Sequence, residues 1–241
     1  MAIRALVFDA YGTLYDVHSV RRLAVDLCGD SGEVVTQLWR LKQLEYTWLR
    51  TLMRSYEDFW SVTKESLVFA LRSVGIEPSS SLCEPLMNRY LHLDLYQGAA
   101  QALGSLRDYQ LAILSNGSPG MLETLVSSSA LAGCFTQVIS VDPVKRYKPD
   151  PACYALVEPA LAVRKEEVLF VSSNGFDVSG AKHYGFQVAW IDRAGDIQTP
   201  KHSAIGPATF YSLIRGRAEQ LGFEADFRVS RLTDLVPLVT K

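Results

Sequence analysis

The sequence is poor in cysteine and histidine, and neither residue type is clustered. Its 241 residues include 4 cysteines and 4 histidines, and none of the cysteines belongs to a CxxC or CxxH pair. Scattered thiols of this kind are typical of buried free cysteines in a reducing cytosol rather than of disulfides or zinc ligands. The histidines match no catalytic or metal-binding spacing. The cysteines are Cys28, Cys83, Cys134 and Cys153.

Neither sign of charge dominates, and long hydrophobic runs are lacking. The 24 basic and 26 acidic residues leave a formal net charge of -2, and no basic cluster forms the stripe that binds nucleic acid or an anionic membrane. The apolar run at 3–8 is too short for a signal peptide, and no run approaches the length of a membrane span. We therefore expect a cytoplasmic protein that binds neither nucleic acid nor membrane.

Hydrophobic residues make up 48% of the chain, enough for a substantial core. From about Ser19 to Arg72 they recur every three or four residues, which predicts helices without strands. A shorter helical stretch is predicted from Leu82 to about Leu93. After Gly98 the pattern changes to alternating helices and strands. Strands are predicted at 3–8, 110–114, 137–141, 168–172 and 187–191, and helices at 99–109, 121–128, 151–162 and 178–184.

Strands that alternate with helices predict an α/β fold with a doubly wound parallel sheet. The all-helical part interrupts this pattern, so we expect a Rossmann-like core domain at 1–14 and 97–241 with an inserted helical cap subdomain at 15–96. A length of 241 residues fits a core with such an insertion. Ligands of open parallel sheets bind beyond the carboxyl ends of the strands. Those ends are where functional side chains should be sought.

Asp9 follows the first predicted strand directly. Alone, it reads most simply as a turn or capping aspartate. Other strand ends, however, carry complementary polar groups, which favours a nucleophile or a ligand at Asp9. These groups are Ser115, Asn116, Lys148, Ser173, Asn174 and Asp177.

Four segments in order resemble the motifs of the haloacid dehalogenase superfamily, and within it the type II L-2-haloacid dehalogenases. They are FDAYGTL at 8–14, LSNGS at 114–118, YKPD at 147–150 and SSNGFD at 172–177. Each motif alone is weak, but four at the expected strand ends are specific. The resemblance extends to about Arg193 and includes the helical insertion.

Most members of this superfamily are phosphatases, so membership alone does not define the reaction. Phosphatases carry a second aspartate two positions after the nucleophile, where this chain has Tyr11. A halide leaves without a proton, so dehalogenation does not need that acid. The fourth motif offers a single carboxylate, Asp177, which is little for Mg²⁺. The resemblance therefore implies hydrolytic dehalogenation of short L-2-haloacids without a metal or another cofactor.

The resemblance also implies roles for the polar residues. Asp9 would attack C2 of the substrate, and water would then cleave the ester at the Asp9 carbonyl. Lys148 would keep Asp9 ionised, and Asp177 with Asn174 would fix Lys148 and position the water. Four further residues complete the catalytic set: Thr13 and Ser115 to orient the carboxylates, Ser172 near Asp9 or the substrate carboxylate, and Tyr154 at a position that matches the family.

Arg40 lies in WRLKQLEYTW at 39–48, which resembles the halide-side segment of these enzymes. Its guanidinium suits a departing anion, and the match to the family segment favours this role over a solvent-facing helix position. Asn116 and the ring edge of Phe176 would complete the halide site. The substrate's alkyl end would lie among apolar side chains, although adjacent aromatics cannot both point inward. These side chains are Tyr11, Leu44, Phe59 and Trp60.

Two alternatives remain at this stage: a metal-dependent phosphatase of the same superfamily, and a non-catalytic protein that binds small acids. The expected partner is a small 2-haloacid, and the family suggests a homodimer through the cap helices. About 15 to 20 residues near 200–222 exceed usual loop lengths. Residues 208–221 could form a helix there, and the segment could be an interface, a flap or decoration.

Overall fold

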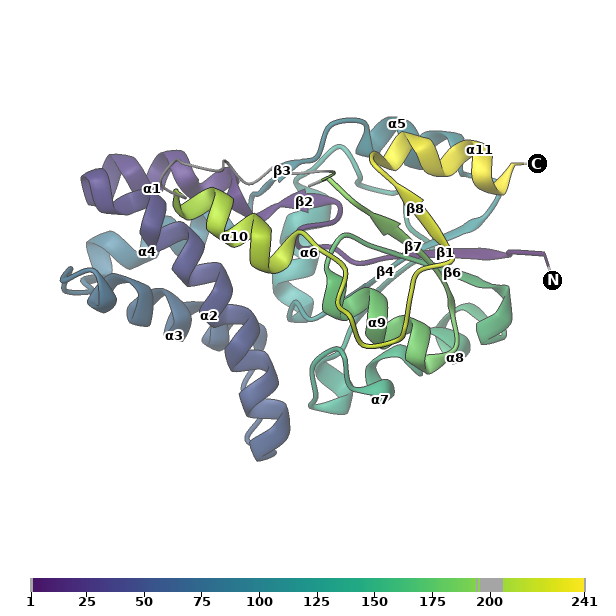
Figure 1. Cartoon of the computed structure of the whole chain (residues 1–241), viewed down its shortest axis with the longest axis horizontal. Coiled ribbons are helices and arrows are strands. Elements are labelled where there is room, and N and C mark those ends of the chain that lie inside the picture. Colours follow the sequence, from purple (N-terminus) through teal and green to yellow (C-terminus); the bar gives the residue numbers. More distant parts are fainter. Residues whose placement is uncertain (1, 194, 196–205, 241) are drawn as a thin grey trace.

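A computed structural model describes residues 2–193, 195 and 206–240. Of the extra segment predicted near 200–222, residues 200–205 lie outside the described residues. A six-stranded parallel sheet forms the centre of the core, in the order β5-β4-β1-β6-β7-β8 (Figure 1). The strands are β1 (Ala5–Phe8), β4 (Gln110–Ser115), β5 (Gln137–Ser140), β6 (Val168–Ser172), β7 (Gln187–Ile191) and β8 (Phe227–Val229).

Helices cover both faces of this sheet, as a doubly wound fold requires. Helices α5 and α11 lie on one face, and α8 and α9 on the other (Figure 1). Strand β1 is buried along its whole length because β4 and β6 flank it on both sides. The core helices are α5 (Ala99–Ser105), α6 (Pro119–Ser127), α7 (Pro151–Tyr154), α8 (Val157–Leu161), α9 (Gly175–Tyr184) and α11 (Val236–Val239).

The cap is entirely helical and packs around the α2–α3 pair. The helical pattern predicted from 19 to 72 is divided at Gly29 and Arg54, whose φ angles are 57° and 55°. A left-handed residue ends a helix because the chain leaves the helical path there. The cap helices are α1 (Arg21–Cys28), α2 (Gly32–Met53), α3 (Phe59–Ser73) and α4 (Ser80–Tyr90).

A small antiparallel pair, β2 (Tyr15–Asp16) and β3 (Asp94–Leu95), joins the cap to the core. It was not predicted, because two residues give no periodicity. The proposed domain boundaries at 14/15 and 96/97 fall beside it and stay predictions. Short 3-10 turns lie at Val17–Val20, Gly29–Ser31, Asp142–Val144, Lys165–Glu167 and Leu232–Leu235.

Three predicted helices were too long. The helix predicted at 99–109 ends at Ser105, and the one predicted at 151–162 is divided into α7 and α8. Pro159 has no N–H to donate to the carbonyl of Ala155, which favours the break. In the C-terminal segment, α10 (Pro207–Arg215) ends before Gly216 instead of reaching 221. Across the described ranges, no helix is both long and apolar enough to cross a membrane.

Candidate active site

Asp9 lies at the carboxyl end of β1, where its carboxylate receives three hydrogen bonds. Lys148 Nζ donates to Oδ1 at 2.9 Å, while Thr13 Oγ1 and Asn174 Nδ2 donate to Oδ2 at 2.9 and 2.8 Å. The residue is only 5% exposed. Charged and neutral donors of this kind stabilise the ionised form of a buried carboxylate. The three donors therefore fix the orientation of the Asp9 carboxylate.

Lys148 connects the two carboxylates of the site. Its Nζ donates to Asp9 Oδ1, to Asp177 Oδ2 at 2.7 Å and to the Leu114 carbonyl at 3.0 Å. These acceptors use all three ammonium hydrogens. Burial alone would lower the pKa of Lys148, but the charges of Asp177 and Asp9 raise it above its usual value. The lysine is thus a permanent cation, and the position predicted for it beside Asp9 is correct.

Asp177 is fully buried at the start of α9. Its Oδ2 accepts from Lys148 and from Ser172 Oγ at 3.2 Å, and its Oδ1 accepts from Tyr154 OH at 2.8 Å. Burial and the charge of Asp9 raise the pKa of Asp177 to about 6, because two buried carboxylates share one cation. A carboxylate that titrates near neutral pH can take a proton from water.

Some predicted contacts differ from those in the structure. Asn174 was expected to fix Lys148, but its amide donates to Asp9 and to the Tyr11 carbonyl. Ser115 was expected to orient the carboxylates, yet its hydroxyl accepts from Gly117 N at 3.1 Å and so shapes the turn after β4. Ser172 Oγ donates to Asp177 Oδ2 at 3.2 Å, and its predicted place near Asp9 or the substrate carboxylate stays a prediction. Strand ends predict proximity, whereas side-chain rotamers decide which partner each group reaches.

Arg40 comes from the cap helix α2 and is only 4% exposed, so the solvent-facing alternative is wrong. Its Nη1 donates to Gln43 Oε1 at 2.6 Å, and its Nη2 donates to the Tyr11 carbonyl at 3.1 Å. These contacts aim one face of the guanidinium toward the core. Because Tyr11 is two residues from Asp9, the cap cation and the core carboxylate belong to one site.

A polar network behind Arg40 was missed from the sequence. Gln43 Nε2 donates to Thr63 Oγ1 at 2.6 Å, and Tyr90 OH donates to Gln43 Oε1 at 2.9 Å. All three residues are buried. The one available signal was Gln43 itself, which lies three residues after Arg40 and hence on the same helix face.

The other residues predicted for halide and substrate lie around this pair. Asn116 Oδ1 accepts from Lys148 N at 2.9 Å, and the half-buried Phe176 ring packs edge-on against Trp48 with centroids 5.3 Å apart. Tyr11 packs against Phe59 with ring centroids 5.3 Å apart. Tyr11 thus contributes its carbonyl to Arg40 and its ring to an apolar wall with Phe59.

Trp60 lies outside the contact between Tyr11 and Phe59, and its place in the substrate site stays a prediction. Phe59 and Leu44 are buried, whereas Trp60 is half-buried and lines surface grooves with Lys64 and Ser118. Neighbouring residues of a helix point about 100° apart, so only one of the two aromatics can face Tyr11. Phe59 takes that place.

The donor set does not suit a hard divalent cation. Mg²⁺ and Ca²⁺ bind several oxygen ligands, but both carboxylates here already contact the Lys148 ammonium at 2.9 and 2.7 Å. The described residues contain no group of three or more His, Cys, Asp or Glu side chains that could hold a metal ion. The remaining carboxylate oxygens accept from Thr13, Asn174 and Tyr154, so all four already have hydrogen-bond donors.

A buried aspartate beside a lysine at the carboxyl end of β1, with an arginine supplied by a helical cap, is typical of hydrolases that form a covalent ester on the aspartate. Residues 3–185 match the haloacid dehalogenase-like hydrolases, and the chain belongs to that family. The resemblance stated from the four sequence motifs is thereby confirmed.

Several relatives are similar along most of the chain. The (S)-2-haloacid dehalogenase of Xanthobacter autotrophicus is 47% identical over 240 residues, which cover 98% of this chain and 95% of that protein. The (S)-2-haloacid dehalogenase of Pseudomonas sp. (strain YL) is 42% identical over 205 residues, covering 82% and 88%.

A solved structure of a relative matches the whole fold. It is the L-2-haloacid dehalogenase from Xanthobacter autotrophicus with chloropropionic acid covalently bound, at a TM-score of 0.91 and 45% identity, covering 99% of this chain and 98% of that one. The predicted α/β class with a helical cap is confirmed by this likeness.

Proposed function

We propose that this chain is a hydrolytic dehalogenase that converts short L-2-haloacids into the inverted 2-hydroxyacid and halide. The observation that carries the proposal is the buried Asp9 carboxylate, which accepts hydrogen bonds from three donors, while position 11 offers a tyrosine instead of a second aspartate. Relatives named (S)-2-haloacid dehalogenases support the same reaction.

In the first step, a carboxylate oxygen of Asp9 attacks C2 of the substrate from the side opposite the halogen. The new C2–O bond forms as the C2–halogen bond breaks, and the halide leaves with the bonding electron pair. We assign the halide to Arg40, Asn116 and Phe176, because anion departure from an apolar pocket needs donors aimed at the developing charge. No proton is needed at this step.

In the second step, water attacks the carbonyl carbon of the Asp9 ester and breaks its bond to the oxygen on C2. Asp177 is the base that we propose for this water, because its raised pKa, about 6, lets it accept a proton near neutral pH. Lys148 stabilises the charge on both carboxylates. Asp177 returns the proton to the oxygen on C2 as that oxygen leaves, so Asp9 is regenerated with one oxygen from water and the hydroxyacid departs with an oxygen that Asp9 contributed.

Phosphate transfer is the nearest rival. When a phosphate ester is cleaved, its alcohol part leaves as an alkoxide that must be protonated. This chain has Tyr11 where phosphatases carry the aspartate that supplies the proton. Burial raises the pKa of the Tyr11 phenol well above its usual value, and the charge of Tyr90 adds to this effect. A phenol of such high pKa gives up its proton less readily than a carboxylic acid. This favours a leaving group that needs no proton.

We also propose a cytoplasmic homodimer with a 2-haloacid as the small-molecule substrate. Support for pairing through the cap comes from the carboxyl end of α2, where Leu49, Leu52 and Met53 are 41%, 79% and 64% exposed. Large apolar side chains gathered on one surface are typical of protein interfaces.

Halide release tests the reaction directly. L-2-chloropropionate, D-2-chloropropionate and chloroacetate are each incubated with the protein and EDTA, beside a phosphatase assay with Mg²⁺. Chloride released from the L-isomer and chloroacetate, but not from the D-isomer, is expected. The Asp9→Ala variant is the control and should release none. Phosphate release with no chloride would overturn the proposal.

A further inference from the structure

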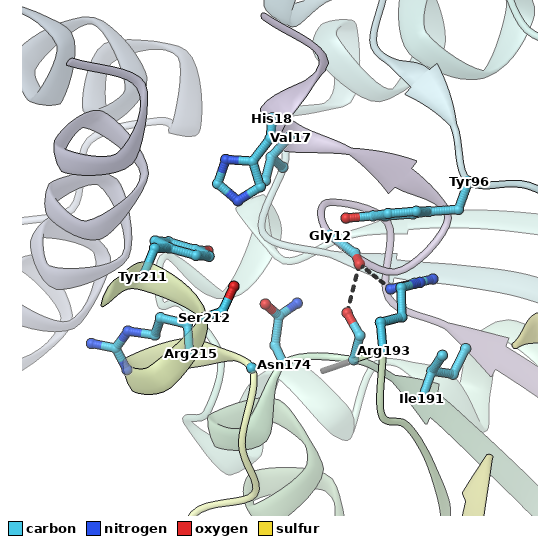
Figure 2. A pocket seen from close by; sticks show the side chains of 12 residues that line it. Gly12, Val17, His18, Tyr96, Asn174, Ile191, Arg193, Tyr211, Ser212 and Arg215 are labelled. Atoms are coloured by element: carbon cyan, nitrogen blue, oxygen red, sulfur yellow. Dashed lines mark hydrogen bonds between the residues drawn. The ribbon is translucent and has the colours of Figure 1, made fainter. Parts of the chain in front are cut away.

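A cavity of about 230 Å³, partly open to solvent, lies where α10 crosses between the cap and the core (Figure 2). It is built from three parts of the chain that are distant in sequence. The cap entrance contributes His18, the core loops contribute Gly12 and Asn174, and α10 contributes Tyr211 and Ser212. Figure 1 shows α10 lying along α2, which places this helix beside the cap.

The Asn174 side chain lies between the cavity and Asp9. Asn174 lines the cavity, and the same amide donates to Asp9 Oδ2 at 2.8 Å. In Figure 2 the Asn174 amide and the Ser212 hydroxyl both point into the open space. A molecule in the cavity would therefore meet Asn174 and, immediately behind it, Asp9.

The charge around the cavity is positive. Arg193 and Arg215 are among its 12 lining residues, and none of the 12 is Asp or Glu. Arg193 donates to the Gly12 and Thr13 carbonyls at 2.8 and 2.6 Å and lies 3.6 Å from the centre of the Tyr96 ring, and no carboxylate of the described residues forms an ion pair with it. Burial lowers the pKa of His18 to about 4, so this imidazole is neutral at pH 7.

Arg215 lies at the α10 side of the cavity. Its guanidinium is 4.8 Å from the Trp48 ring, and the nearest carboxylate in an ion pair with it is Glu219 at 3.8 Å. Its buried Nε has no hydrogen-bond partner in the described part of the chain. A weakly compensated cation at the edge of a cavity attracts anions from solvent.

We infer that this cavity is a vestibule that receives small carboxylates on their way to Asp9, with α10 as its outer wall. The inference rests on the proposed function, because 2-haloacids and their hydroxyacid products are carboxylates. It assigns the segment after residue 206 a part in substrate passage. The Ser212 hydroxyl offers a hydrogen bond to the carboxylate, and Arg193 and Arg215 supply the attraction.

The passage is tested by filling the cavity. Ser212→Trp places an indole in a space of about 230 Å³, and Ala208→Trp puts the same group at an exposed position of α10 outside the lining. The expected result is at least a tenfold fall in kcat/KM for L-2-chloropropionate in Ser212→Trp, with Ala208→Trp near wild type. Equal values for the two variants would overturn the vestibule.

The charge is tested with a second matched pair. Arg215→Gln and Arg217→Gln remove the same charge two residues apart, but Arg217 is exposed and outside the lining. Arg215→Gln should lower kcat/KM about threefold to tenfold and weaken its dependence on salt, as expected for a steering charge. Thermal unfolding of both variants checks that the fold is retained.

Two controls separate the effect of charge from the reaction itself: a neutral substrate and the wild-type protein. With 2-chloropropionamide, Arg215→Gln and Arg217→Gln should give the same kcat/KM. If Arg215 acts in substrate entry, its substitution lowers kcat/KM at constant kcat. If it acts in product exit, its substitution lowers kcat. Chloride release by the wild type tests the proposed function separately. In a wild type that releases chloride, equal effects of the two arginine variants on the acid would contradict an anion vestibule.

Discussion

Replacing Lys148 with methionine removes an ammonium group that three acceptors surround, while keeping most of the side-chain volume. The lysine side chain is 1% exposed, and the Asp9 and Asp177 side chains that it contacts are 7% and 0% exposed. Without Lys148, two carboxylates remain buried and close together. Removing one partner from a buried ion pair costs roughly 3 to 5 kcal/mol. For a chain of this size that corresponds to a fall in Tm of roughly 6 to 20 °C.

The loss should depend on pH. Lys148 lowers the pKa of Asp177, so the variant raises that pKa further above its unfolded value. The folded variant then binds more protons than the unfolded chain, and its stability falls as pH rises. We expect the deficit relative to wild type to be larger at pH 7.5 than at pH 5.5, and turnover to be lost.

Thermal and urea unfolding at both pH values measure this effect. Lys182→Met is the control, because Lys182 pairs with Asp226 at 2.5 Å where both side chains are about one third exposed. An exposed pair of this kind contributes at most about 1 kcal/mol. If Lys148→Met costs no more than Lys182→Met, or if its deficit grows toward pH 5.5, the account of a shared buried cation is wrong.

Three further substitutions test single contacts. Tyr154→Phe removes a hydrogen bond that lowers the pKa of Asp177, so activity should be lost at a higher pH on acidification than in wild type; an unchanged acid limb would contradict this. Gln43→Leu removes the acceptor of Arg40 and should cost roughly 1.5 to 3 kcal/mol in urea unfolding, as well as activity; an unchanged unfolding midpoint would contradict this. Tyr11→Phe removes a buried hydroxyl with no partner among the described residues, so Tm should not fall.

The site could be located from sequence because of a property of parallel sheets. The carboxyl ends of neighbouring strands meet at one edge, so polar residues after β1, β4 and β6 had to lie close together. Asp9, Asn116 and Asn174 were found in this way, and the family motifs added Lys148. Strand ends were predicted within about two residues, because short apolar runs between polar segments define them well.

Particular contacts could not be predicted. The bond of Asn174 to Asp9 and the turn made by Ser115 depend on side-chain rotamers that spacing does not encode. The Gln43 network depends on helix α3 packing against α2, a long-range arrangement. The place of α10 beside the site also follows from packing, since an isolated amphipathic helix carries no signal for what it covers.

The ester of Asp9 is the centre of the account, and oxygen-18 tests it most directly. Excess protein turns over L-2-chloropropionate once in labelled water, and mass spectrometry then follows the product and the peptide that contains Asp9. The account predicts unlabelled hydroxyacid and one labelled oxygen in that peptide, because water cleaves the ester at the Asp9 carbonyl. Label in the product with none in the peptide would mean that water attacks C2 directly, and would contradict Asp9 as the nucleophile.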